Sequence, residues 1–454
     1  MAAVVSDGVS APLPGRCAFY VAKKKRYCKM VVGNGKKFCG EHADSDNERK
    51  RIPCPLDPKH TVFEDSLAKH LKKCNSKEKP KPVYYVKDIN AGSVTEEENT
   101  IDEVSIAERS KEELDSLIQK LKTALKGLNT EPDTSLLSHP ALNDALNDPK
   151  NGNFAFKHLK QQASILGNME ALELLGPERC YVEFGAGKGK LSHWIHVALQ
   201  EAENVHFLLV ERSSTRFKVD GKHKNTDSTF DRLQVDIQHL DLSRVPFLQE
   251  KRLPVIAVGK HLCGAATDLA LRCLFERSAK DKDCEPPTKR IKLQEKRGEE
   301  ETRSIESSEE VVVLGLTVAL CCHHRCEWRH YVGKDFFRER GLGETEFSAF
   351  QRMSSWATCG MSRVKSSLNP EKSTQENVED GEEGEHEESS ENMPDHLNND
   401  VSAEEREHVG RLCKMLINHG RLHYLQQRGF KPSLRYYTSR DVSLENVLLT
   451  ALPS

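Results

Sequence analysis

The chain has 454 residues, enough for roughly two to three domains, and its formal net charge is −3. It contains no apolar run of about 18 residues, and its start lacks the basic and apolar segments of a signal peptide, so we expect neither a membrane span nor secretion. We therefore expect a location in the nucleus or the cytoplasm, where the 14 cysteines serve as thiols or metal ligands rather than disulfides.

The nearly neutral average hides an uneven distribution of charge. Residues 1–82 contain 18 Lys and Arg against 9 Asp and Glu, whereas residues 371–405 contain 14 acidic residues and one Lys. A basic arm suits a polyanionic partner. The acidic segment has no aromatic residue between 366 and 403, so we expect a disordered insert there.

Two groups of cysteines and histidines in the basic arm have the spacing of metal ligands. The first group follows a C-x10-C-x10-C-x2-H pattern and the second a C-x5-H-x9-H-x3-C pattern: Cys17, Cys28, Cys39 and His42, then Cys54, His60, His70 and Cys74. Each group offers the four ligands of a closed zinc site, and too few apolar residues lie between them for a core. We predict two structural zinc ions, in modules at 1–50 and 51–82; the alternative is chance spacing in a disordered basic tail.

Basic and aromatic side chains accompany these ligands. Lysines and tyrosines in both modules could contact phosphates and stack on bases, or the lysines could simply be solvated: Lys23–Arg26, Lys69, Lys72, Lys73, Tyr20 and Tyr27. A Lys/Pro segment at 77–82 then leads into a linker at 83–150. Apolar residues at helical spacing predict an amphipathic helix over 105–128, and a second helical pattern covers 153–175.

A strand, a glycine turn and a helix follow at 181–199. The acidic residue Glu183 precedes Gly185, Gly187 and Gly189, with Ala186 between the first two glycines. Glycines permit a tight turn and close approach of a ligand, and a carboxylate before them suits the ammonium of S-adenosylmethionine better than a pyrophosphate. We predict cofactor binding at this turn; a nucleotide site and a purely structural turn are the alternatives.

The remaining pattern alternates strands and helices, as in an α/β domain with a mainly parallel sheet. We expect further strands at 205–210, near 234–236, at 255–258, 311–320, 434–437 and 447–451, in a methyltransferase domain spanning 151–454. Glu211 ends the second strand and would bind both hydroxyls of a ribose. Asp236 would accept from an adenine amino group, with Asp241 as the alternative.

Polar clusters follow the fourth and fifth strands, at the sheet edge where open α/β folds bind ligands. Lys260 could stabilise a developing alkoxide, and His261, His323 or His324 could accept a proton, or these histidines could have structural roles. The cysteines of the 321–326 run, with its two histidines, could instead bind a third metal ion. A nucleophilic Cys263 is a further alternative.

A charged insert is expected at 278–310, between the helix after the fourth strand and the fifth strand. Its 286–292 segment could be a nuclear-import signal, but a solvated loop fits it better. The insert is not expected to contribute to the site.

Several of these runs together resemble one family. The two ligand arrays, with Cys54–His60, and the runs EFGAGKGKLS, GKHLCG, ALCCHHRCEW, QRMSSWATCG and SLENVLLTA are similar to eukaryotic tRNA 2′-O-methyltransferases that act on nucleotide 4 of the acceptor stem. The second array also resembles a finger of a minor-spliceosome protein. The resemblance implies a Rossmann-like class I S-adenosylmethionine-dependent methyltransferase domain preceded by two small zinc-finger modules, with the tRNA acceptor stem as partner.

Two other functions remain open on the sequence alone. One is a non-catalytic RNA-binding adaptor with a degenerate methyltransferase fold, although the intact set of Glu183, the glycines, Glu211 and Asp236 argues against it. The other is a methyltransferase acting on protein or on an RNA base nitrogen. No Asp/Asn-Pro-Pro-Tyr/Phe motif follows the fourth strand, which disfavours base-nitrogen methylation.

Overall fold

The computed structural model describes residues 12–22, 26–33, 35–39, 42, 51–74, 76–77, 80–92, 106–213, 229–276, 311–359 and 401–454. These residues form two compact units, 1–81 and 82–454. Several predicted segments lie outside the described residues: the insert at 278–310 with its basic 286–292 run, the 366–400 part of the acidic segment, and Lys23–Lys25. In the described part of the chain, no helix is long and apolar enough to cross a membrane.

The first unit contains two short antiparallel hairpins. β1 (Tyr20–Val21) pairs with β2 (Arg26–Tyr27), and β3 (Arg51–Cys54) pairs with β4 (Asp57–Phe63). A 3-10 turn, η2 (Glu64–Ser66), and helix α1 (Leu67–Lys73) follow β4. The buried core of the second hairpin contains Cys54, Val62 and Cys74, so its buried residues include two of the predicted metal ligands.

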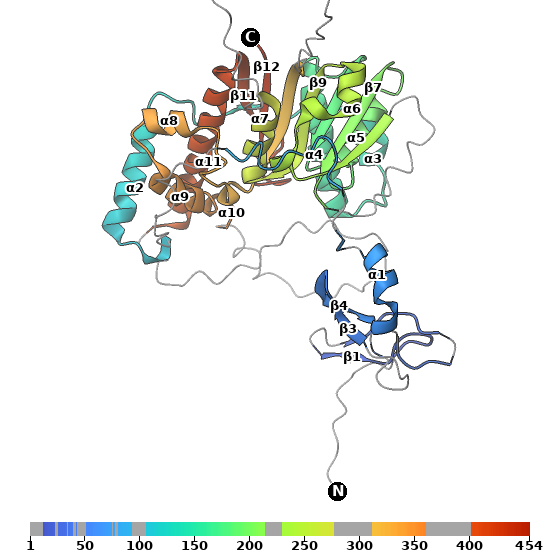
Figure 1. Cartoon of the computed structure of the whole chain (residues 1–454). Helices are drawn as coiled ribbons and strands as arrows, with labels where there is room; N and C mark the ends of the chain where they lie inside the picture. The colour runs from blue at the N-terminus through green and yellow to red at the C-terminus, as the bar shows by residue number, and fades with distance from the viewer. Residues whose placement is uncertain are drawn as a thin grey trace, which may run out of the picture. The chain divides into compact units, whose positions relative to one another are not determined.

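The second unit is built on one mixed sheet of eight strands, ordered β5-β11-β12-β10-β9-β6-β7-β8 (Figure 1). The strands are β5 (Asp133–Thr134), β6 (Arg179–Phe184), β7 (Val205–Glu211), β8 (Thr229–Gln234), β9 (Val255–Cys263), β10 (Val313–Cys321), β11 (Phe430–Tyr436) and β12 (Val447–Pro453). β6 to β10 run parallel to one another, and β12 is antiparallel to both of its neighbours.

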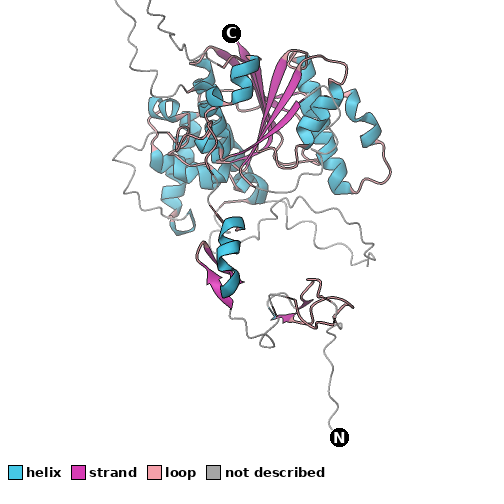
Figure 2. Cartoon of the chain, turned by 45° about the vertical axis from the view of Figure 1, so that its right-hand side comes forward, coloured by secondary structure: helices cyan, strands magenta, loops and turns pink. Residues whose placement is uncertain are grey.

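Helices cover both faces of this sheet (Figure 2). The central strands are mostly apolar because both of their faces are buried, although they also contain the buried polar residues Glu183, His206 and Thr317. One face packs against residues of α6, α7 and α11, and the other against α4 and α5. The covering helices are α3 (Asn143–Leu146), α4 (Asn153–Ala171), α5 (Lys190–Ala198), α6 (Pro246–Lys251), α7 (Ala265–Phe275) and α11 (Ala403–Gln426).

A separate helical cluster lies beside the sheet, around α11 (Figure 1). It contains α2 (Lys111–Ala124), α8 (Lys334–Glu339), α9 (Glu344–Met353) and α10 (Trp356–Cys359), and its apolar side chains form one core with those of α11. The remaining 3-10 turns of this unit are η4 (Ile106–Glu108), η5 (Pro140–Leu142), η7 (Ile237–His239), η8 (Leu242–Arg244) and η10 (His323–Arg325).

The predicted strands are all present, and two features differ from the prediction. β5 adds an eighth strand at the edge, parallel to β11. β9 continues five residues beyond the predicted end at 258, because Leu262 and Cys263 still pair with Leu320 and Cys321 of β10. The GKHLCG run is therefore the end of a strand rather than a loop.

Candidate functional site

The glycine turn lies at the point where the strand order reverses. From β6 the chain passes to β7 and β8 on one side of the sheet and returns with β9 on the other side of β6. In open α/β sheets this reversal leaves a crevice at the carboxyl ends of the strands, where ligands bind. The turn after β6 and the end of β9 both lie at this edge of the sheet.

The turn depends on three glycines in left-handed conformations. Gly185, Gly187 and Gly189 have φ values of 63°, 49° and 75°, which residues with a Cβ rarely adopt. At Gly189 a Cβ would also lie 2.6 Å from Leu209 Cδ2. Helix α5 begins directly after Gly189, which supplies no side-chain cap. Close approach of a ligand to bare backbone is therefore possible here.

Glu183 is buried below this turn, with an exposed fraction of 3%. Its Oε2 accepts hydrogen bonds from the Ser192 backbone N–H at 3.0 Å and from Ser192 Oγ at 2.5 Å. The carboxylate thus serves the first turn of α5, a role that the sequence analysis did not predict. Burial raises the pKa of Glu183 to about 7, although Ser192 and the charges of Arg232 and Lys260 oppose this rise.

The carboxylate of Glu211, at the end of β7, joins the second strand to the glycine turn. Its Oε2 accepts from the Gly187 backbone N–H at 3.1 Å, and its Oε1 accepts from the backbone and hydroxyl of Ser213. Burial would raise the pKa of Glu211, but these hydrogen bonds outweigh it and the pKa is lowered. The structure therefore brings together two residues that the sequence analysis assigned to one cofactor.

Asp236 and Asp241 occupy different settings after β8. Asp236 caps η7 by accepting from the Gln238 backbone at 3.0 Å, and its side chain is 37% exposed. Asp241 is buried, caps η8 through Ser243 and forms an ion pair with Arg244 at 3.1 Å. A ligand at the sheet edge could reach Asp236 more easily than Asp241.

Lys260 projects from the extended part of β9 into the interior and is 6% exposed. Its Nζ lies 2.7 Å from Nδ1 of the buried His158 on α4. If Lys260 is an ammonium group, which donates and cannot accept, then His158 accepts at Nδ1. His158 was missed in the sequence analysis because it lies 102 residues before Lys260 in a helix with no distinguishing motif. The side chain of His261 is outside the described residues.

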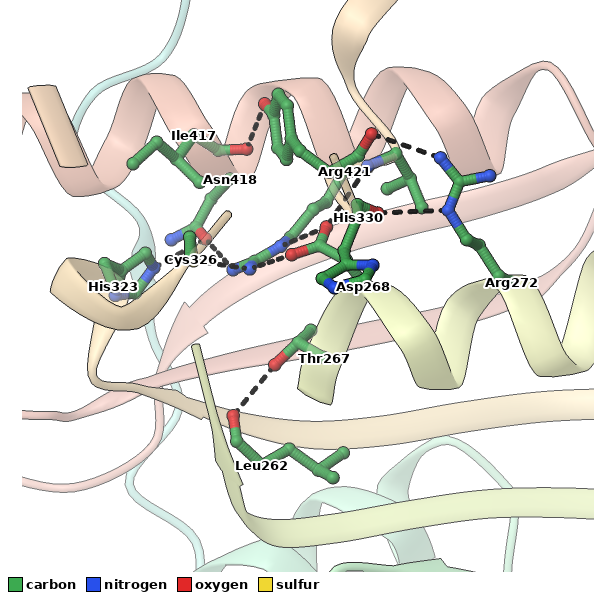
Figure 3. A network of polar contacts seen from close by, with 12 residues as sticks. Leu262, Thr267, Asp268, Arg272, His323, Cys326, His330, Ile417, Asn418 and Arg421 are labelled. Carbon is green, nitrogen blue, oxygen red and sulfur yellow. Dashed lines mark hydrogen bonds and ion pairs between the residues drawn. The ribbon is translucent and has the colours of Figure 1, made fainter. Parts of the chain in front are cut away.

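His323 belongs to a buried polar network between α7, η10 and α11 (Figure 3). Its Nε2 contacts Asn418 Oδ1 at 2.8 Å, and the same oxygen accepts from Arg421 Nη1 at 3.1 Å. Arg421 also binds both carboxylate oxygens of Asp268, at 3.2 and 2.7 Å, and donates to Cys326 Sγ at 3.2 Å. Burial, with the charges of Arg421 and Lys414, lowers the pKa of His323 well below its usual value. This setting favours the structural alternative for His323, whereas His324 is partly exposed.

The cysteines at this edge gather differently from the predicted 321–326 cluster. The Sγ atoms of Cys263, Cys321 and Cys322 lie within 4.8 Å of one another, while Cys326 is directed to Arg421 instead. The Cys263 and Cys321 sulfurs are 3.3 Å apart. Hydrogen bonds from Cys321 and Cys322 lower the pKa of Cys263.

The two predicted ligand sets of the first unit each converge on one point. In each set the four ligand atoms lie within 4.8 Å of one another. In the first, His42 Nδ1 is 3.5 Å from Cys17 Sγ and 3.3 Å from Cys39 Sγ. In the second, Cys54 Sγ and Cys74 Sγ are 3.8 Å apart and the two histidine Nε2 atoms 3.1 Å apart. A tetrahedron with Zn–S of about 2.3 Å and Zn–N of about 2.0 Å has S···S and N···N edges of about 3.8 and 3.3 Å, so both sets fit zinc.

Comparison with known proteins identifies the family. The family described as Methyltransferase TRM13 matches residues 160–452, more than half of the chain. The chain belongs to the TRM13 methyltransferase family. The CCCH zinc finger in TRM13 protein matches residues 15–43, and the U11-48K-like CHHC zinc finger matches residues 51–75. These two ranges contain the two convergent ligand sets.

The similarity to TRM13 proteins extends over the whole chain. A mouse protein named tRNA:m(4)X modification enzyme TRM13 homolog is 57% identical, covering 100% of this chain and 97% of the mouse protein. The human protein of that name is 58% identical, covering 98% and 95%. A Schizosaccharomyces pombe protein named tRNA:m(4)X modification enzyme TRM13 is 34% identical, covering 90% and 96%.

Proposed function

We propose that this protein is an S-adenosylmethionine-dependent tRNA methyltransferase that modifies nucleotide 4 of the acceptor stem at the ribose 2′-oxygen. The observation that carries the proposal is the end-to-end similarity to proteins named tRNA:m(4)X modification enzymes, at 57% identity for the mouse protein. The tie between Glu211 and the glycine turn supports a working cofactor site, because a degenerate domain has no need to keep it.

We further propose that the sheet is a Rossmann-like class I methyltransferase sheet. The arrangement supports this assignment in three respects: a glycine turn after β6, a reversal of strand order beside β6, and a last strand, β12, inserted antiparallel between β10 and β11. In this assignment β5 is an addition at the edge of the seven remaining strands.

The residues at the crevice fit S-adenosylmethionine, which supplies an activated methyl group when bound. The glycine turn offers backbone for close approach, Glu211 offers carboxylate oxygens for the ribose hydroxyls, and Asp236 offers an acceptor for the adenine amino group. Glu183 would supply negative charge for the ammonium from beneath the turn. Both described hydrogen bonds to Glu183 use Oε2.

Lys260 is the residue best placed to act on the acceptor hydroxyl. A ribose 2′-hydroxyl is a weak acid, so its methylation requires stabilisation of the developing alkoxide or removal of its proton. The contact with His158 Nδ1 holds the Lys260 side chain at the end of β9. Of the predicted proton acceptors, the partly exposed His324 fits better than the buried His323.

The zinc-finger unit would hold the RNA. Lys69, Lys72 and Lys73 are exposed on α1, and the rings of Tyr20 and Tyr27 meet edge to face on the first hairpin, at 5.4 Å. Phosphate contacts by lysines give affinity without sequence preference, and tyrosine rings can stack on unpaired bases. Sequence or position preference would then come from the catalytic unit.

The direct test is transfer of labelled methyl groups from S-adenosylmethionine into total tRNA, followed by mass spectrometry of the nucleosides. The proposal predicts a 2′-O-methylated nucleoside in fragments of the acceptor stem. A label found on a base nitrogen would overturn the assigned acceptor atom. Absence of incorporation, with cofactor and RNA both bound, would favour the adaptor function instead.

A further inference from the structure

The cluster of Cys263, Cys321 and Cys322 lies where β9 and β10 end. Cys263 is the last residue of β9 and Cys321 the last of β10, and the two are partners in the parallel register. Their sulfurs are 3.3 Å apart, and Cys322 completes a group within 4.8 Å. Each of the three side chains is partly exposed, so an ion could enter from solvent.

The inclusion of Cys322 requires a special backbone. Successive residues of a strand point to opposite faces, so adjacent cysteines ordinarily place their sulfurs apart. Cys322 leaves β10 in the left-handed region, with φ 49° and ψ 45°, which is unfavourable for a residue with a Cβ. This conformation allows its sulfur to lie within 4.8 Å of the sulfurs of Cys321 and Cys263.

Neighbouring groups hold this arrangement in place. The Cys322 backbone N–H donates to Glu445 Oε1 at 3.2 Å, and Glu445 Oε2 pairs with the buried Lys414 at 2.8 Å. On the other side, Gly264 has a φ of 57°, and a Cβ there would lie 2.3 Å from the carbonyl oxygen of Arg325. The turns after β9 and β10 therefore pack backbone to backbone, and the sulfurs they carry have a fixed relation.

We propose that Cys263, Cys321 and Cys322 bind a third zinc ion, with an oxygen ligand, water in the free protein, at the fourth position. Thiolates bind zinc much better than they bind the abundant cations Mg²⁺ and Ca²⁺. Zinc sites that act on a bound oxygen ligand have three protein ligands and leave the fourth position open. The Cys263 and Cys321 sulfurs, 3.3 Å apart, need to separate by only about half an ångström to reach the S···S edge of about 3.8 Å. The Cys54–Cys74 pair already has that separation.

A disulfide explains the same cluster less well. Cys263 and Cys321 are adjacent across the strands and could be oxidised, but this would leave Cys322 without a role and its unfavourable backbone without a cause. A metal ion uses all three sulfurs. The proposal concerns the metal content of the chain and does not depend on the identity of the methyl acceptor.

The test is the zinc content of the full-length protein, purified under reducing conditions and measured by inductively coupled plasma mass spectrometry. We expect three zinc ions per chain in the wild type and two in each of Cys263→Ser, Cys321→Ser and Cys322→Ser. Cys326→Ser is the matched control, because the Cys326 sulfur contacts Arg421 rather than the cluster; it keeps three. Two zinc ions in the wild type, or no loss in the three variants, would overturn the proposal.

A second measurement covers variants that fail to fold. The double variant Cys39→Ser/Cys54→Ser disables both fingers and leaves residues 82–454 unchanged, and we expect it to retain one zinc ion, or one Co²⁺ with a thiolate charge-transfer band after exchange. A metal-free double variant contradicts the site. An intact mass about 2 Da below that of the reduced chain would show a disulfide in place of the metal.

Discussion

Burial and hydrogen bonding shift the pKa of the Glu183 carboxyl group in opposite directions. This carboxyl group is buried beneath the glycine turn, and it accepts hydrogen bonds from the first turn of α5. Burial disfavours the ionised form more than Ser192 favours it, so the pKa is raised. A cationic ligand at the turn would reverse this balance, because a nearby positive charge stabilises the carboxylate.

The raised pKa predicts that the ligand-free protein loses stability between about pH 4.5 and about pH 7. In this range Glu183 stays protonated in the folded state, where its pKa is about 7. In the unfolded state its pKa is near 4.5, so the proton has been released. The contribution of Glu183 to the free energy of unfolding is therefore complete below about pH 4.5. It is lost as the pH rises to about 7, by up to about 3 kcal/mol.

Thermal unfolding at about pH 5 and about pH 7.5 measures this loss. Glu183→Gln cannot ionise, so its melting temperature should fall less between the two pH values than that of the wild type. Glu203→Gln, at an exposed carboxylate, is the matched control and should follow the wild type. Equal falls in the wild type and in Glu183→Gln would contradict the proposed titration.

Replacement of Lys260 should lower the rate of methyl transfer without weakening the binding of tRNA. Lys260→Met removes the charge at the end of the crevice, so the single-turnover rate of methyl transfer should fall by about 10² or more while the Kd for tRNA changes little. Lys157→Met, at an exposed position of α4 next to His158, is the control and should change neither quantity strongly. A loss of affinity at an unchanged rate would make Lys260 an RNA-binding residue.

At the scale of single residues, candidate site residues could be selected from the sequence, but the residues that contact them could not. Glu183, Glu211 and the glycines could be identified because they are close in sequence or end strands. The partners of Lys260 and Cys263, which are His158 and Cys321, lie 102 and 58 residues away. No local pattern encodes such contacts, since only the packing of α4 on β9 and the register of β9 with β10 create them.

At the scale of secondary-structure elements, a buried ion pair stabilises the packing of α11 on α7. Arg421 and Asp268 join α11 to α7 and are both almost fully buried, at 1% and 0% exposure. Removal of one partner leaves an uncompensated charge, so Arg421→Met should cost about 3–5 kcal/mol in the free energy of unfolding. Arg411→Met breaks a half-exposed pair on the same helix and should cost about 1 kcal/mol or less.

Urea denaturation of the two variants measures this difference. The double variant Asp268→Leu/Arg421→Met provides a further check, because it removes both charges and should recover part of the lost stability. Similar costs for Arg421→Met and Arg411→Met would mean that the buried pair has no special weight in joining the two helices.

Removal of one zinc ligand from the second zinc finger should cause the loss of both its metal ion and its folded structure. Its core contains few buried apolar groups apart from the cysteines, so the zinc ion must supply much of its folding energy. Cys54→Ser should lower the zinc content by one ion per chain, measured by atomic absorption, and should speed proteolysis within residues 51–77. Lys69→Ala, on the exposed face of α1, should keep its zinc. An unchanged zinc content in Cys54→Ser would remove this residue from the ligand set.

Long periodic elements could be predicted from the sequence, and short ones could not. Apolar runs placed β6, β7, β9, β10 and the last two strands, β11 and β12, and helical spacing placed α2 and α4. The two-residue β5 is too short to show any periodicity. The end of β9 could not be predicted from the polar GKHLCG run, because pairing with β10 rather than composition makes this run a strand.

At the scale of the whole molecule, the two units differ in charge and in the candidate groups that they carry. Residues 1–82 carry an excess of basic over acidic residues, 18 against 9, and the candidate cofactor and acceptor groups lie after them. Family membership then adds what physical reasoning could not provide, namely the class of RNA.

The most direct test of the central claim uses two synthetic tRNAs that each lack a single ribose 2′-oxygen, at different positions. One carries a 2′-deoxyribose at nucleotide 4 and the other at nucleotide 3, and both are incubated with the protein and labelled S-adenosylmethionine. We predict that the first is bound but not methylated, whereas the second is methylated at a rate close to that of the unmodified transcript. Equal methylation of both transcripts would contradict 2′-O-methylation at nucleotide 4.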